Sequence, residues 1–373
     1  MRKKKAGRKS QISPQRPGPN FYQKRFKILG VSFSSSSMDE LLKEIDRWLA
    51  NCSKDQLMIV TPNPEFVVEA QKDPIFRETI NRAQISLPDG VGIIWARKLV
   101  VSGLKKPFLA FKFGLMALKG ELAQERISGV DFMIELVKLG RRRGWRFFFL
   151  GAGPGVAAQA AAKLLGPPSK RTKGGRDPLL PAASGRRQGS LWVKLFSSDR
   201  RPAERARGLL ALLDKFTGRA SAGKTGVEAS IRERKRGLAP NDRLSFGPNW
   251  AAFAGDGSPA GDKQTLAAIK KAAQKLGGPI DLLFVAYGMK KQEAWIQRNL
   301  PKLPVKLAIG VGGAFDYLAG VVPRAPCRWR QMGLEWLYRL IRQPWRWRRQ
   351  LNLIHFIRLV LSYNEAKIPA DRQ

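Results

Sequence analysis

One carboxylate, Asp89, stands where a short apolar run ends and a glycine-containing turn begins. The stretch Ile85-Ser-Leu-Pro-Asp-Gly-Val-Gly-Ile-Ile-Trp-Ala96 places it between two apolar segments. An aspartate in this place either takes part in chemistry or shapes the turn, because Asp-Gly is a common turn pair. Other polar residues and glycines also follow apolar runs closely, namely Thr61, Asn63, Gly288, Gln292, Glu293, Gly312 and Gly313.

The apolar runs that precede these residues are short and continuous, which is typical of strands buried on both faces. Helical patterns separate them, and this alternation predicts an α/β fold with a Rossmann-like, mainly parallel sheet flanked by helices. Ligands of such sheets bind outside the carboxyl ends of the strands, where the candidate residues lie. The predicted strands are 56–61, 83–88, 145–150, 280–286 and 305–310.

The composition limits the chemistry that these residues can perform. The chain has 373 residues with 43% hydrophobic content, which is enough for a large packed core. The net charge of +39 predicts attraction to anions such as nucleic acid, acidic lipid or phosphorylated substrates. Cys52, Cys327 and the single His355 supply neither a disulfide framework nor a Cys- or His-rich metal site, so we expect a reducing compartment and no metal.

Shifts in composition divide the chain into five parts, with a C-terminal amphipathic helical appendage after the α/β domain. No apolar run approaches the roughly 20 residues that span a bilayer, so we expect a soluble or peripheral protein. The parts are a disordered basic tail (1–22), a first part of the α/β domain (23–165), a basic flexible insertion (166–250), a second part of the domain (251–322) and the appendage (323–373). Within the first part, residues 100–125 mix phenylalanines with lysines and either pack on the domain or lean on a membrane.

Two functions suggested by single features remain as alternatives. The turn Gly151-Ala-Gly-Pro-Gly-Val resembles a dinucleotide fingerprint, which would suit a nicotinamide-dependent oxidoreductase, but Ala157 replaces the last glycine. An ordinary strand–helix turn and a diphosphate cradle both fit it. The charge suits a nucleic-acid-binding protein, although the sequence contains no recognised nucleic-acid motif.

Six motifs together are more specific than either feature. They resemble the WecG/TagA/CpsF family of bacterial glycosyltransferases over about residues 25–165 and 250–352. The motifs are Thr61-Pro-Asn-Pro-Glu, Leu87-Pro-Asp-Gly-Val-Gly, Arg126-Ile-Ser-Gly-Val-Asp131, Phe284-Val-Ala-Tyr-Gly-Met-Lys-Lys-Gln-Glu, Gly310-Val-Gly-Gly-Ala-Phe-Asp316, and Arg324-Ala-Pro with Gly333-Leu-Glu-Trp-Leu-Tyr-Arg-Leu340.

The resemblance implies a membrane-associated inverting transferase without a metal or other cofactor. Its donor would be a UDP-sugar with an N-acetylmannosamine-like group, and its acceptor a polyprenyl-diphosphate-linked N-acetylglucosamine in cell-surface polysaccharide or teichoic acid assembly. We then expect a cytoplasmic enzyme that is peripheral at the inner face of the cell membrane. A homo-oligomer is also among the candidate partners.

The resemblance also assigns roles, each beside a structural alternative. Asp89 would be the base that removes the acceptor proton. Thr61 and Asn63 would hydrogen-bond the sugar or orient Asp89, or else cap the following helix. Arg126 would contact a diphosphate or the acceptor, because its fork donates two parallel hydrogen bonds, or else pair with Asp131 or Glu125.

The remaining candidates would bind the nucleotide and the membrane. Gln292 would read the sugar or uracil edge, with Glu293 delivered to the same place. Gly288, Gly312 and Gly313 would allow close backbone approach to the diphosphate, or simply form tight turns. In the C-terminal appendage, arginines would meet phosphate while tryptophans and aliphatic residues enter the acyl boundary, or the helix would only pack on the domain; these arginines are Arg324, Arg339, Arg346 and Arg349.

Overall fold

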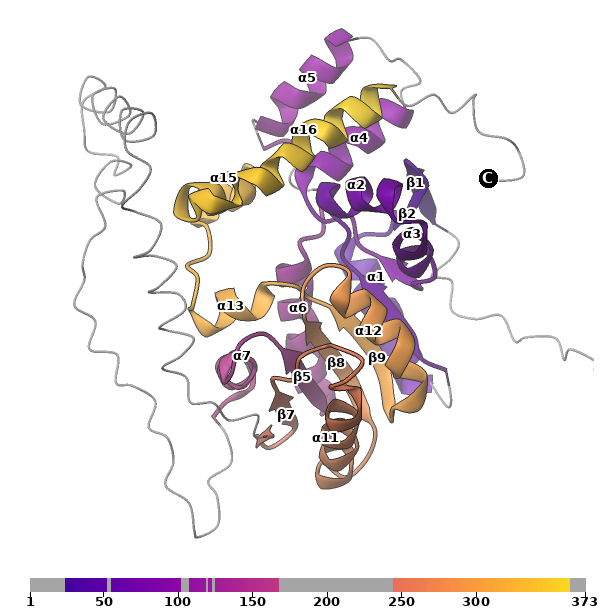
Figure 1. Cartoon of the computed structure of the whole chain (residues 1–373), viewed down its shortest axis with the longest axis vertical. Coiled ribbons are helices and arrows are strands. Elements are labelled where there is room, and N and C mark those ends of the chain that lie inside the picture. Colours follow the sequence, from indigo (N-terminus) through magenta and orange to yellow (C-terminus); the bar gives the residue numbers. More distant parts are fainter. Residues whose placement is uncertain are drawn as a thin grey trace, which may run out of the picture. The chain divides into compact units, whose positions relative to one another are not determined.

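A computed structural model describes residues 24–51, 55–101, 107–118, 120–122, 125–167 and 244–362 (Figure 1). The expected basic tail at 1–22 lies outside the described residues. So do positions 168–243 of the expected insertion and the last residues of the appendage from position 363 onward.

The core is a seven-stranded sheet in the order β4-β3-β9-β8-β5-β7-β6. All neighbouring pairs are parallel except β6 with β7, which is antiparallel, so the prediction of a mainly parallel sheet is confirmed. Strand β6 lies in the last residues of the predicted insertion, so the sheet resumes earlier than position 251. The strands are β3 (Leu57–Val60), β4 (Ile85–Ser86), β5 (Phe147–Gly151), β6 (Ser245–Phe246), β7 (Trp250–Phe253), β8 (Ile280–Ala286) and β9 (Val305–Gly310).

Helices cover both faces of this sheet. Side chains of β3, β5 and β8 alternate between the two faces and all are buried, so each face needs a covering layer. On one face, Phe149 of β5 packs against Phe284 of β8 at 5.3 Å and against Phe315 of α13 at 5.5 Å between ring centroids. On the other face, Phe148 belongs to a core with Trp295 of α12. The helices that follow the strands are α2 (Pro64–Lys72), α3 (Pro74–Asn81), α4 (Val91–Val101), α5 (Pro107–Leu118), α6 (Gly129–Arg143), α7 (Val156–Leu165), α11 (Asp262–Lys275), α12 (Lys291–Asn299), a short η2 (Leu300–Lys302) and α13 (Ala314–Ala319).

The chain enters this sheet through a hairpin and a capped helix. Strands β1 (Arg25–Ile28) and β2 (Val31–Ser34) pair antiparallel. Helix α1 (Met38–Asn51) follows. A capping box begins this helix, because Ser37 N donates to Glu40 Oε2 at 2.8 Å and Glu40 N donates to Ser37 Oγ at 3.3 Å.

The C-terminal segment forms α14 (Cys327–Gln331), α15 (Glu335–Arg342), η3 (Pro344–Arg346) and α16 (Trp347–Ser362). Helix α16 packs along α2 and α4, with Phe356 and Val360 buried beneath it (Figure 1). Among the described residues, no helix is both long and apolar enough to cross a bilayer.

Candidate active site

The segments that follow β3, β4 and β9 meet at the carboxyl edge of the sheet. Directly after β3, Thr61 Oγ1 donates to the carbonyl oxygen of Gly310 at 3.3 Å. After β4, the backbone amide of Asp89 donates to Pro62 O at 3.1 Å. These bonds join three of the sequence motifs at the place where a parallel sheet binds its ligands.

Asp89 is half-buried at this edge, and its environment makes it an unusually basic carboxylate. Burial raises the pKa of Asp89 to about 6. Arg126 and the backbone amide of Gly129, the first residue of α6, oppose this rise by stabilising the charged form. Glu335 and Asp131 add to it, because a second negative charge disfavours ionisation. Asp89 can therefore hold or accept a proton close to neutral pH.

A cluster of ion pairs beside Asp89 connects the start of α6 to the C-terminal segment. Arg324 Nη1 lies 2.8 Å from Asp131 Oδ1, and its Nε lies 3.1 Å from Glu335 Oε1. Arg126 Nη2 donates to Arg330 O at 3.0 Å and lies 3.9 Å from Glu335 Oε2. The buried Arg126 thus contacts Glu335, and not the predicted Asp131 or Glu125, while Arg324 joins two carboxylates.

Gln292 and Glu293 are buried side by side and hold the turn after β9. Gln292 Oε1 accepts from the amide of Gly312 at 3.0 Å, and its Nε2 donates to Glu293 Oε1 at 2.7 Å. The other oxygen of Glu293 accepts from Lys290 N at 2.8 Å. Burial raises the pKa of Glu293 to about 7. Because both ends of the Gln292 amide are engaged within the protein, the structure favours a supporting role over direct reading of a ligand.

Three other predicted residues occupy positions that the backbone itself requires. Asn63 Oδ1 accepts from Phe66 N at 3.1 Å and so caps α2, which is one of the two roles predicted for it. Gly288 and Gly312 have φ values of +85° and +51°, which favour glycine. These backbone angles are those of tight turns, which is the structural alternative predicted for both glycines.

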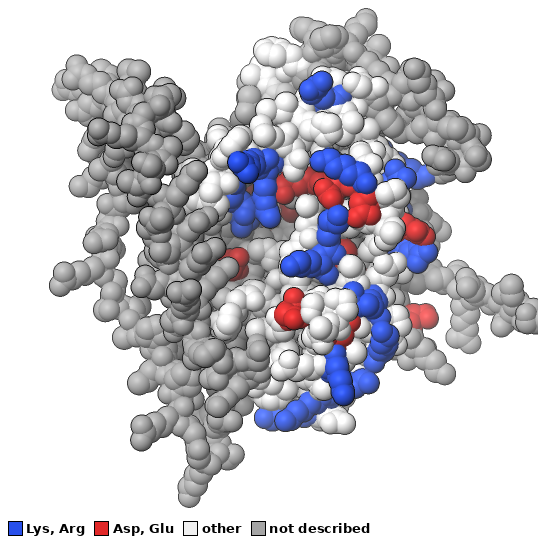
Figure 2. All heavy atoms as spheres, viewed as in Figure 1, with Lys and Arg blue, Asp and Glu red and all other residues white. Residues whose placement is uncertain are grey.

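Three arginines of the C-terminal segment converge near the turn after β9. A Cβ atom on Gly313 would lie 3.2 Å from Arg339 Nη2, and the Arg339 guanidinium lies 5.1 Å from the ring centre of Tyr317. Burial, together with Arg339 and Arg349, lowers the pKa of Arg346 to about 10. Within the described residues, the buried Nε of Arg346 has no hydrogen-bond partner. Figure 2 shows basic side chains gathered beside acidic ones at the level of α15.

The glycine turn after β5 is closed by a neighbouring strand. Gly151 and Ala152 have φ values of +101° and +60°, and the amide of Ala152 donates to Ala286 O at 3.0 Å. Gly155 precedes α7 without a side-chain cap. These contacts account for the turn as a strand–helix connection.

Comparison with known proteins identifies the fold and its chemistry. A model of the Glycosyl transferase WecG/TagA/CpsF family matches residues 26–174 and 250–368. The chain belongs to this family. It is therefore a glycosyltransferase, and the predicted resemblance is confirmed.

Three relatives of this glycosyltransferase share one name, N-acetylglucosaminyldiphosphoundecaprenol N-acetyl-beta-D-mannosaminyltransferase. The protein from Bacillus spizizenii is 25% identical over 90% of each chain. A protein from Staphylococcus aureus strain MRSA252 is 24% identical over 84% of this chain and 83% of its own length. The Bacillus subtilis strain 168 protein is 41% identical over a shorter stretch, 23% of this chain and 34% of its own.

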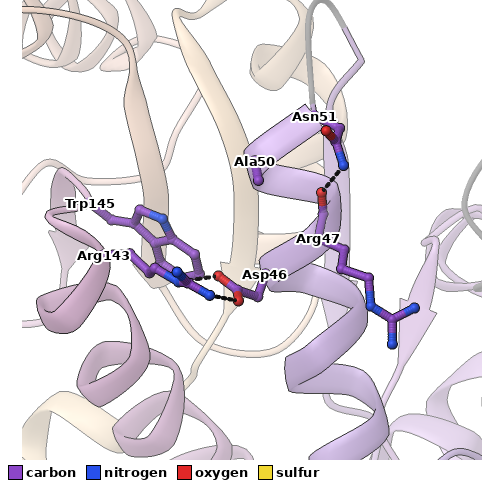
Figure 3. Close-up of a pocket in the computed structure, with 6 residues that line it drawn as sticks. All are labelled: Asp46, Arg47, Ala50, Asn51, Arg143 and Trp145. Carbon is purple, nitrogen blue, oxygen red and sulfur yellow. Dashed lines mark hydrogen bonds and ion pairs between the residues drawn. The ribbon is translucent and has the colours of Figure 1, made fainter.

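A separate hollow of the glycosyltransferase lies at the opposite edge of the sheet (Figure 3). It is formed by the end of α1, which precedes β3, and by residues that precede β5. Arg143 spans it and pairs with both carboxylate oxygens of Asp46. The hollow and Asp89 therefore lie at opposite ends of the strands. The residues that line the hollow are Asp46, Arg47, Ala50, Asn51, Arg143 and Trp145.

The predicted apolar face of the C-terminal helix is exposed in the glycosyltransferase. Its members follow helical spacing along α16 and are between 37% and 59% exposed. The opposite face of the same helix supplies the buried residues that pack on α2 and α4. The exposed members are Trp347, Leu351, Ile354, Ile357 and Leu361.

Sequence reasoning missed three residues of this site: Glu335, Arg330 and Tyr317. Glu335 had a usable signal, because it is the only acidic residue between positions 323 and 362. A lone carboxylate among many arginines is expected to pair with them and not to face solvent alone. Tyr317 and Arg330 had no comparable signal, since their neighbours come from distant parts of the chain.

Among the described residues, no group of three or more His, Cys, Asp or Glu side chains is placed to hold a metal ion. The cationic groups that the structure describes near the turn after β9 include the guanidinium groups of Arg339 and Arg346 from the C-terminal segment.

Proposed function

We propose that this glycosyltransferase moves an N-acetylmannosamine-type sugar from a UDP donor to a polyprenyl-diphosphate-linked N-acetylglucosamine, with inversion at the anomeric carbon. The donor sugar and acceptor follow the names of relatives that match over most of their length. The observation that carries the mechanism is Asp89, a half-buried carboxylate of raised pKa at the carboxyl edge, with the Arg126 guanidinium near it.

Asp89 acts as the general base in this proposal. An inverting transfer needs one group to take the proton of the acceptor hydroxyl while its oxygen attacks the anomeric carbon and the bond to UDP breaks. With a pKa of about 6, Asp89 is mostly ionised at neutral pH, yet it binds a proton more readily than an ordinary aspartate. Both properties suit a base that works near pH 7.

The arginines near Gly313 stabilise the UDP leaving group. Negative charge develops on the diphosphate as the sugar leaves, and oriented donors in a partly buried site stabilise it strongly. Arg339, Arg346 and Arg349 lie close enough to one another to depress the pKa of Arg346. A bound diphosphate would relieve this repulsion and offer an acceptor to the Nε atom of Arg346.

In this proposal the reaction takes place at the inner face of the cell membrane, with the acceptor's lipid chain held in the bilayer. The exposed apolar residues of α16 would enter the interface, and the neighbouring Arg348 and Arg358 would meet anionic headgroups. This arrangement brings a lipid-linked diphosphate to the edge that carries Asp89.

The test is UDP release by the purified full-length chain with UDP-N-acetylmannosamine and a short-chain prenyl-diphosphate-linked N-acetylglucosamine. We expect release only when donor and acceptor are both present, and NMR of the product should report an inverted anomeric configuration. Asp89→Asn should remove turnover and keep the fold, whereas Asp46→Asn, at the opposite edge, should stay active. Retention of anomeric configuration, or full activity of Asp89→Asn, would refute the proposed mechanism.

A further inference from the structure

Helix α5 exposes large apolar side chains that the proposed chemistry does not use. Its sequence, Pro-Phe-Leu-Ala-Phe-Lys-Phe-Gly-Leu-Met-Ala-Leu, contains no acidic residue. Phe111 is 71% exposed and Leu115 is 44% exposed. They are four residues apart, so they lie on one face of the helix. Phe113 and Met116 pack instead against the hydrophobic core, so α5 is apolar on its buried and its exposed side.

An adjacent, exposed Phe and Leu pair on a helix marks a contact surface, since soluble proteins seldom leave apolar patches in water. The surface does not stand alone. Helix α4 packs against both α5 and α16, and Figure 1 shows the three helices at the same end of the domain. Helix α5 with its exposed Phe111 and Leu115, and α16 with its exposed apolar residues, are therefore both neighbours of α4.

The charges of these helices indicate what covers them. Neither α5 nor α16 contains Asp or Glu. Their exposed charged residues are all basic, namely Lys112, Arg348, Arg349 and Arg358. Apolar side chains bordered by cations suit the interface of an anionic bilayer, where the apolar groups meet acyl chains and the cations meet phosphate.

We propose that α5 is a second membrane-seated helix, and that Phe111 and Leu115 enter an anionic bilayer alongside the exposed face of α16. The inference rests on the membrane seating of α16 proposed above and adds a contact that the C-terminal segment does not supply. One helix lying in an interface leaves the domain free to rotate about that helix axis. Two helices define a plane, and so fix how the carboxyl edge with Asp89 faces the lipid-linked acceptor.

The first experiment measures binding of the full-length chain to vesicles of phosphatidylcholine with and without phosphatidylglycerol. Phe111→Glu combined with Leu115→Glu should weaken binding to the anionic vesicles by about tenfold or more, because two apolar contacts are lost and two like charges are added. Ala50→Glu, at the opposite edge of the sheet, is the control and should bind as the unaltered chain does. Turnover of a water-soluble short-chain acceptor by the α5 variant should be unchanged.

The second experiment locates α5 directly. In a chain with Cys52→Ser and Cys327→Ser, an environment-sensitive fluorophore on Leu115→Cys should shift to the blue with anionic vesicles. Nitroxide-labelled lipids should quench it, and the same label on Ala50→Cys should respond to neither. Quenching at position 115 does not depend on activity, so it separates failure of this proposal from failure of the proposed reaction.

Two results would overturn the inference. One is wild-type vesicle binding by the Phe111→Glu, Leu115→Glu chain under conditions in which Ile354→Glu loses binding, which would confine the contact to α16. The other is a smaller assembly of the Phe111→Glu, Leu115→Glu chain than of the unaltered chain in sedimentation, while both chains bind vesicles equally. That outcome would assign the exposed face of α5 to a second copy of the chain.

Discussion

The pH dependence of turnover tests the role of Asp89 most directly. Burial lifts the pKa of this carboxyl from an ordinary 3.8 to about 6. A base with that pKa is roughly nine-tenths ionised at pH 7 and half ionised at pH 6. The acid limb of kcat/KM should therefore fall with a midpoint near pH 6, about two units above the midpoint of an ordinary aspartate.

The same shift predicts that Asp89 costs the protein stability. Between pH 6 and pH 4 the folded chain keeps a proton on Asp89 that the unfolded chain has lost. The contribution of this residue to the free energy of unfolding thus falls as pH rises through that window, and stays low above it. Two pKa units correspond to about 3 kcal/mol, an upper figure because part of the residue reaches solvent.

Asp89→Asn removes this penalty and should raise the melting temperature at pH 7.5 while abolishing turnover. At pH 3 or below, where both states of the wild type are mostly protonated, the two chains should melt close together. Scanning calorimetry at the two pH values measures the difference. A variant that is inactive and also less stable at pH 7.5 would mean that the carboxylate is a structural element, and the reasoning from burial would be refuted.

Glu293 is a second carboxyl whose pKa is raised close to that of Asp89. The acid limb of kcat/KM must therefore be assigned to one of the two residues. Burial raises the pKa of Glu293 to about 7, with hydrogen bonds from Gln292 and Lys290 opposing the rise. Glu335 raises the pKa of Asp89 through its negative charge. Glu335→Gln should therefore move the acid limb to lower pH if the limb belongs to Asp89. An unmoved limb would assign it to another group.

Three further outcomes follow from the same contacts. Arg346→Ala should raise KM for the UDP-sugar about tenfold or more in steady-state assays, because a charged donor to the diphosphate is lost, whereas the exposed Arg348→Ala should leave it near wild type when a soluble acceptor is used. Thr61→Val should lower the free energy of unfolding in urea by about 1 kcal/mol through loss of the bond to Gly310 O, and Thr61→Ser should keep it. Glu293→Gln should flatten the fall in stability that the wild type shows as pH rises from 4.5 to 7, and an unchanged slope would contradict the raised pKa.

The sheet was predictable from the sequence because its strands are continuous apolar runs bounded by turn residues. Strand β8 is buried along its whole length, which matches the run at 280–286. Helix α3 was not predicted, although Asp73 caps it and Pro74 begins it. Only Asp73 separates its eight residues from the end of α2, so the sequence pattern does not show a second helix there. The sequence does not predict a helix at α5, because its apolar residues occupy both faces and show no clear helical period.

The location of the site was predictable, but the duties of its residues were only partly so. The rule that ligands bind at carboxyl ends brings Thr61, Asp89 and the turn after β9 together, and hydrogen bonds join these segments. The sequence could not show that both the oxygen and the nitrogen of the Gln292 amide form hydrogen bonds within the protein. Nor could it pair Arg126 with Glu335, because these residues are more than 200 positions apart and meet only through the fold.

The charges at this edge are divided in a way that the proposed reaction requires. A base loses strength beside excess positive charge, because cations stabilise its ionised form. A departing diphosphate needs that excess. Around Asp89, the cations Arg126 and Arg324 are matched by Asp131 and Glu335.

Around Arg346, by contrast, the neighbouring charges are mainly Arg339 and Arg349, with Glu65 as a weaker opposing influence. Glu335 belongs to the region of Asp89, since it pairs with Arg324 and raises the pKa of Asp89. It comes from the same C-terminal segment as the arginines that surround Arg346. The C-terminal segment therefore supplies both the positive charge around Arg346 and the carboxylate that raises the pKa of Asp89.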